Sequence, residues 1–214
     1  NQNFKIDLWR QQVVDTINHY SLTERLEEFM GRRMEWNIYL SPLVGWGAYN
    51  FYIPNGNENN EIHFVLGYNP RYNKDDKSAM NEQPFFAQKD ILIDLIWHEG
   101  SHSYITPLIE NDKEFISTYS KLVTSDMHEQ LQKAGRFDWS WEYYLNEVIV
   151  RAIVAKLLYT HFDEKSGMTE LENQKNNGFH HIERVFNLLT KYEQTDKKGI
   201  TYFFELLKQD LNNW

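Results

Sequence analysis

Apolar and polar residues alternate along the chain with two different periods. Residues 4–35 carry apolar side chains at helical spacing and predict two helices. Ser21 and Glu24, three residues apart, are typical of a capping box at the start of the second helix. Short segments rich in aromatic and β-branched residues, separated by Gly, Pro and Asn clusters, predict strands at 36–40, 48–53 and 61–67. We expect the last two strands to form a hairpin.

After residue 85 the apolar periodicity is helical to the end of the chain. It predicts helices at 88–105, 112–133, 141–161, 178–193 and 200–211. Pro107 and Gly135 are expected to end the first two, and Gly167, Gly178 and Gly199 to separate the others. The sequence therefore predicts an α+β fold, with a small N-terminal β-sheet and flanking helices followed by a mainly helical body. No linker or repeat divides the chain, which indicates a single domain over residues 1–214.

Composition and charge narrow the range of partners. The net charge is −9 and Lys and Arg form no cluster larger than a pair, which argues against nucleic acid because phosphate binding needs clustered basic side chains. No apolar run approaches the roughly 20 residues of a membrane span. Cysteine is absent, so disulfides, thiolate metal ligands and cysteine nucleophiles are excluded.

The candidate chemistry lies in the predicted helix 88–105. His98 and His102 are four residues apart, which places them about 40° apart around the helix axis and about 6 Å apart along it. Two imidazoles so arranged can bind one ion. Glu99 points about 100° away and can hold the metal-bound water and take its proton. The alternative is a pair of core histidines beside a Glu in a salt bridge.

A catalytic zinc site needs a third protein ligand and an open position for water. The metzincin pattern would require Gly and His where this chain has Ile105 and Leu108. Glu147 is the better candidate, because it shares one face of the apolar segment 145–155 with Arg151. A carboxylate on such a helix is either a metal ligand or half of a buried ion pair. Weaker alternatives for the third ligand are Glu142, His128, His161 and the His180–His181 pair.

The sequence His98-Glu99-Gly100-Ser101-His102, with an Asn-Glu pair on a later helix, resembles the gluzincins, which are zinc peptidases. It resembles more closely an uncharacterised bacterial family of predicted secreted proteins with the same core. The resemblance implies a zincin-like fold and one zinc ion held by His98, His102 and Glu147. Glu99 would then be the general base in the hydrolysis of a peptide or protein substrate.

The same resemblance carries three further expectations. The strand 61–67 would be an edge strand beside the active-site helix, pairing with the substrate backbone. Several gluzincins have an Asp four residues after the ligand Glu, where this chain has Arg151, which can only donate. Asp94, one turn before His98, is therefore a candidate acceptor for a ligand imidazole. A secreted, periplasmic or cell-surface location is expected, and a removed signal peptide or a cloning choice would explain a sequence that starts at Asn1.

The tetrahedral intermediate of peptide hydrolysis needs a hydrogen-bond donor besides the metal. We favour His180 as this catalytic residue, because residues 178–181 open a predicted helix. The alternatives are His181, Tyr143, Tyr144 and Tyr159. Two other functions stay open. One is a non-catalytic binding module that retains the metallopeptidase fold. The other is a glycan-acting protein, suggested by the 15% aromatic content and the many carboxylates. The oligomeric state cannot be inferred from these patterns.

Overall fold

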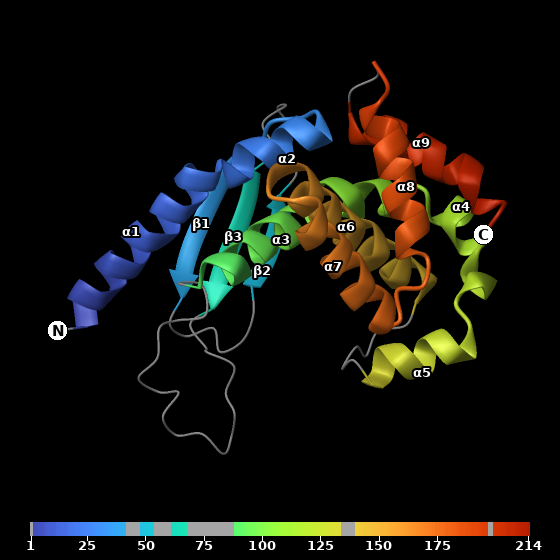
Figure 1. Cartoon of the computed structure of the whole chain (residues 1–214), viewed down its shortest axis with the longest axis horizontal. Coiled ribbons are helices and arrows are strands. Elements are labelled where there is room, and N and C mark those ends of the chain that lie inside the picture. The colour runs from blue at the N-terminus through green and yellow to red at the C-terminus, as the bar shows by residue number, and fades with distance from the viewer. Residues whose placement is uncertain (1, 42–47, 54–60, 68–87, 134–139, 197–198) are drawn as a thin grey trace. The chain divides into compact units, whose positions relative to one another are not determined.

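The computed structural model describes residues 2–41, 48–53, 61–67, 88–133, 140–196 and 199–214 (Figure 1). Helices predominate in it and a small sheet lies in the first third of the chain, which confirms the α+β class. The chain divides into two compact units, residues 1–28 with 33–103 and residues 29–32 with 104–214. The boundary after residue 103 falls inside one continuous helix, α3 (Lys89–Glu110). That the whole chain is one domain stays a prediction.

Two helices open the chain, as predicted: α1 (Gln2–Tyr20) and α2 (Leu22–Met30). Ser21 between them has a φ of 48°, in the left-handed region, whereas an N-cap residue is extended. The Glu24 carboxylate accepts a hydrogen bond from the Thr23 hydroxyl at 3.1 Å. Ser21 is therefore the turn between the two helices, and the predicted capping box was wrong.

The sheet has the strand order β1-β3-β2. These strands are β1 (Glu35–Ser41), β2 (Ala48–Ile53) and β3 (Glu61–Gly67). Strands β2 and β3 are antiparallel, which confirms their predicted pairing, and β1 runs parallel to β3. Ile62, Phe64 and Leu66 of β3 are fully buried and form its core face. Because β3 pairs with β1 on one side and with β2 on the other, the expectation that 61–67 is an edge strand was wrong.

Helix α3 continues for three residues beyond Pro107, so the expected helix end at this proline was wrong. A proline inside a helix lacks the N–H that would bond the carbonyl four residues earlier, here that of Ser103. The last turn of α3 is nevertheless anchored, because Ile109 is buried. Burial of that side chain offsets the lost backbone bond, and the helix ends at Glu110.

The second unit consists of helices. They are α4 (Lys113–Ser117), a 3-10 turn (Ser120–Leu122), α5 (Ser125–Lys133), α6 (Trp141–His161), α7 (Glu164–Asn176), α8 (Ile182–Glu193) and α9 (Ile200–Leu211). The single helix expected over 112–133 is interrupted, because Val123 is extended and the Thr124 hydroxyl accepts a bond from the Met127 N–H. The predicted helices 141–161 and 200–211 are confirmed, and the helix expected from 178 starts at Ile182.

Helix α6 is the centre of this unit and packs against α7 and α8 (Figure 1). All residues from Val148 to Leu157 are buried, which explains the nearly continuous apolar sequence. Gly167 was expected to separate two helices, but it lies inside α7. A Cβ on Gly167 would lie 2.5 Å from Cβ of Tyr159 and 2.7 Å from the Ala155 carbonyl, so this glycine permits close contact between α6 and α7. None of the described helices combines the length and apolar character needed to cross a membrane.

Candidate metal centre

The part of α3 that carries His98, Glu99 and His102 is held in place by contacts of neighbouring residues on the same helix. The Trp97 indole donates to the Leu22 carbonyl of α2 at 2.9 Å, and the Ser101 hydroxyl donates to the Trp97 carbonyl at 2.6 Å. Gly100 allows the helix to approach the sheet, because a Cβ there would lie 2.5 Å from the Trp36 ring of β1. These contacts pack this part of α3 against α2 and the sheet.

Asn50 of β2 adds a polar contact to the same helix. Its Nδ2 donates to the backbone carbonyl of Glu99 and to the Ser103 hydroxyl. The carbonyl contact assigns the amide orientation, since only the nitrogen can donate. The contact fixes the backbone of Glu99, the residue expected to act as general base, and Glu99 itself is half-buried.

His98, His102 and Glu147 form one group of possible metal ligands. Their ligand atoms all lie within 4.8 Å of one another. The two imidazole rings have centroids 5.0 Å apart and planes at 79°. Both histidines are half-buried and Glu147 is buried. Zinc binds such nitrogens and oxygens at about 2.0–2.2 Å, and this group of donors could hold one ion. Within the described part of the chain no second group of this kind was found.

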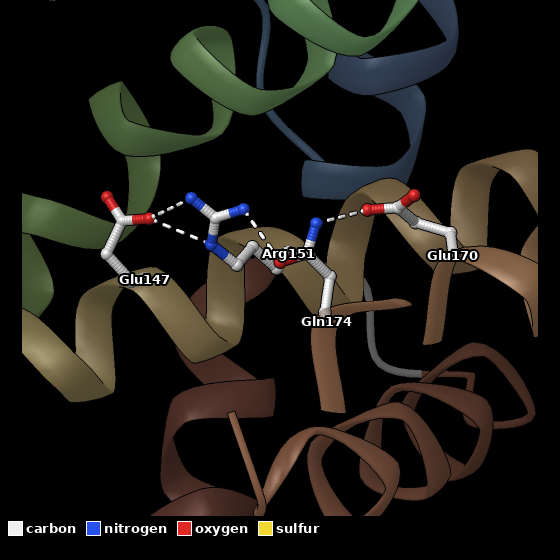
Figure 2. A network of polar contacts seen from close by, with 4 residues as sticks. All are labelled: Glu147, Arg151, Glu170 and Gln174. Carbon is white, nitrogen blue, oxygen red and sulfur yellow. Dashed lines mark hydrogen bonds and ion pairs between the residues drawn. The ribbon is translucent and has the colours of Figure 1, made fainter. Parts of the chain in front are cut away.

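The Glu147 carboxylate is also half of a buried ion pair, which was the other expectation for this residue. Arg151 donates to its Oε2 from Nε at 3.0 Å and from Nη2 at 2.7 Å (Figure 2). The third nitrogen, Nη1, donates to Gln174 Oε1 at 2.9 Å, and Gln174 Nε2 donates to Glu170 Oε1 at 2.6 Å. The guanidinium also lies 4.7 Å from the centroid of the Phe179 ring. The two interpretations of Glu147, ligand or ion-pair partner, are thus compatible.

A hollow of about 330 Å³ lies in the second unit and is lined by the last turns of α3, the start of α4 and the start of α6. At its edge the Asn146 amide donates to the Thr106 hydroxyl at 2.8 Å, linking α6 to the last turns of α3. Asn146 precedes Glu147 in the chain, and Thr106 lies one helical turn beyond His102. The lining residues are Thr106, Ile109, Glu110, Lys113, Ser140, Glu142, Tyr143 and Asn146. The hollow is large enough for a substrate side chain.

Comparison with known proteins places the chain in a family. Residues 6–208 match a family described as a domain of unknown function, DUF4932. The chain belongs to the DUF4932 family. The match covers both described units and every candidate site residue, but its description assigns no activity. No curated protein and no solved structure matches the chain.

In this DUF4932 chain His180 is not a member of the three-residue group. It is exposed, and its Nε2 is 2.7 Å from Gln130 Oε1 of α5. Its role as a catalytic donor stays a prediction. Asp94 is exposed on α3 one turn before His98, and its role as an imidazole acceptor also stays a prediction. His128, His161 and Glu142, the weaker ligand candidates, are not members of the group.

The other candidate donors divide between the core and the surface. The Tyr144 hydroxyl pairs with Nδ1 of His181 at 3.0 Å, and burial raises the pKa of this tyrosine. Burial, with the nearby His180 and Arg184, lowers the pKa of His181 to about 4, so its imidazole is neutral at pH 7. Tyr143 lines the hollow, whereas the Tyr159 ring packs against Phe186. Tyr143 is thus the candidate that faces an open space.

Several residues that build the site have no signal in the sequence. Gln174 and Phe179 contact Arg151 from outside α6, and Glu170 contacts Gln174. Glu170 and Gln174 lie on a segment for which the sequence predicts no helix. Asn50, which bonds α3 from β2, stands in a strand that had no assigned role. Only the ligand spacing and the Glu147–Arg151 spacing can be seen in the sequence.

Proposed function

We propose that this DUF4932 chain is a zinc-dependent peptidase with a zincin-like fold. The observation that carries the proposal is the group formed by His98, His102 and the buried Glu147. Two imidazoles and one carboxylate, without thiolate, are the ligand set of several catalytic zinc sites, whereas structural zinc sites usually contain Cys. Three protein ligands leave a fourth position for water or substrate.

The proposed division of labour follows from the placement of the side chains. A bound zinc would supply a Lewis acid that activates water and polarises the scissile carbonyl. Glu99, adjacent to a ligand on α3, would take the proton of the attacking water and deliver it to the leaving amine. The hollow lined by Tyr143 and Asn146 would receive a substrate side chain. The proposed substrate, a peptide or a protein segment, is the one that the resemblance to the gluzincins implies.

Hydrolysis of a mixed peptide library tests this proposal. The wild-type protein, loaded with zinc, is expected to cleave library peptides, and a chelator should stop cleavage until zinc is restored. Glu99→Gln should retain the metal and lose cleavage by about 100-fold or more, the range of a lost general base. Glu114→Gln, on an exposed position of α4, is the matched control. Equal cleavage by wild type and Glu99→Gln would remove Glu99 from the mechanism.

One observation favours a second candidate function, a non-catalytic binding module that retains the metallopeptidase fold. Arg151 already supplies a positive partner for Glu147, so the carboxylate is compensated without a metal ion. Metal analysis after dialysis, together with unfolding curves in chelator, separates the two candidates. A protein that retains zinc and cleaves no library peptide would support the binding module and contradict the peptidase.

A further inference from the structure

The contact between Arg151 and Glu147 is asymmetric in a way that bears on how the carboxylate can bind a metal. An arginine fork often pairs its two nitrogens with the two oxygens of a carboxylate. Here Nε and Nη2 both donate to Oε2, at 3.0 and 2.7 Å (Figure 2). A carboxylate has about four lone-pair sites, two on each oxygen. The guanidinium therefore fills the acceptor capacity of Oε2.

The guanidinium is itself held in this position by residues of the second unit. Nη1 donates to Gln174, and the Gln174 amide donates in turn to Glu170 of the same helix α7. The two hydrogen bonds form a chain in which Arg151 donates to Gln174 and Gln174 donates to the Glu170 carboxylate. The Phe179 ring lies on the guanidinium at 4.7 Å, and the Arg151 side chain is only 7% exposed. Arg151 thus has little freedom to release Oε2.

We propose that Arg151 is a positioning residue that restricts Glu147 to binding a metal through one oxygen only. This inference rests on the proposed metal site. With Oε2 occupied by the guanidinium, coordination falls to Oε1, and the protein supplies two nitrogens and one oxygen. A carboxylate that bound through both oxygens would fill a further position around the ion. Arg151 therefore preserves the open position on which zinc hydrolysis depends.

Cobalt substitution measures this restriction without any assay of activity. Four-coordinate Co²⁺ absorbs visible light more strongly than five-coordinate Co²⁺, so the visible spectrum of the cobalt-loaded protein reports coordination number. X-ray absorption of the zinc-loaded protein counts the light ligands independently. We expect four ligands in the wild type. Arg151→Met keeps most of the side-chain length but removes both donors to Oε2, and we expect a fifth ligand and a loss of visible absorbance. Gln174→Met, which frees one end of the guanidinium, should change the spectrum less.

Arg184→Met is the matched control, because Arg184 also forms an ion pair on the second unit, with Asp210. It should lower stability and leave both metal spectra unchanged. If Arg151→Met does not fold, Arg151→Gln, which keeps neutral donors, and Gln174→Met provide the comparison. The inference would be overturned if the wild type bound metal and gave the same metal spectra as the Arg151 and Gln174 variants. That result would leave the proposed metal site intact. A wild type that binds neither Co²⁺ nor Zn²⁺ would overturn the proposed function and this inference together.

Discussion

Replacing Gly100 by Ala tests how closely α3 approaches the sheet and α2. A Cβ at this position would lie 2.5 Å from Cη2 of Trp36 and 2.8 Å from Cδ2 of Leu26. Real carbon atoms do not approach so closely, so one neighbour has to move. The Trp36 ring is restrained, because its Nε1 donates to Glu27 Oε1 at 3.0 Å, and Leu26 is fully buried. The Glu27 oxygen also accepts the Met34 N–H, which fixes the acceptor.

Two opposing terms set the size of the effect. Overpacking of a filled core costs about 1–3 kcal/mol. Alanine favours a helix over glycine by about 1 kcal/mol. Because two restrained groups are displaced together, we expect the upper half of the first range and a net loss of about 1–2 kcal/mol in the free energy of unfolding.

Urea unfolding followed by circular dichroism measures this difference from the midpoint and slope. Ser101→Ala is the control on the next residue, because it removes the bond to the Trp97 carbonyl and adds no atom. We expect it to cost about 1 kcal/mol or less, the range for one hydrogen bond. A Gly100→Ala protein more stable than wild type would show that the helix has room at this position and would refute the close approach.

Two further predictions concern the metal and the pH. Zinc at a hundredfold excess over its dissociation constant should stabilise the wild type by about 2.7 kcal/mol, a rise of roughly 5–10 °C in the unfolding temperature. His102→Ala should abolish this rise and His180→Ala should keep it. An undiminished rise in His102→Ala would exclude His102 as a ligand. Burial lowers the pKa of His181 from its ordinary 6.5 to about 4. Between these two pH values the unfolded chain binds more protons than the folded protein, so this histidine makes the free energy of unfolding fall as the pH drops from 6.5 to 4. His181→Phe, measured in urea across this range, should show a shallower fall, and an unchanged slope would contradict the cause given for it.

The sequence predicts most of the helices because their apolar positions repeat without interruption. The predicted helix 141–161 coincides with α6, which Ser140 caps by accepting the Tyr143 N–H. Errors occur where a local breaker is outweighed by packing. Pro107 does not end α3, because the buried Ile109 stabilises the turn beyond it. Helix α7 escaped prediction because its sequence is polar and its buried residues are only Gly167 and Leu171, too few to show a helical period.

The candidate ligands on α3 can be predicted because local helix geometry sets their spacing, whereas the order of the strands cannot be predicted in this way. His98 and His102 are neighbours on one helix, and their distance follows from helix geometry alone. Glu147 and Arg151 are likewise four residues apart on α6, so their ion pair follows from the same rule. Sheet order has no such rule: the strand at 61–67 has the same residues whether it lies at the edge or in the centre. Its position depends on pairing with β1, which is distant in the chain.

Arg151 shows that a buried charge makes demands on the residues around it. An Asp at this position would be a second negative charge beside Glu147 and could accept a proton from an imidazole. An arginine instead brings a positive charge and needs acceptors of its own, which a buried site must supply. Helix α7 provides them through Gln174 and, behind it, Glu170. The polar sequence that makes α7 hard to predict therefore includes Gln174, an acceptor that the buried arginine requires.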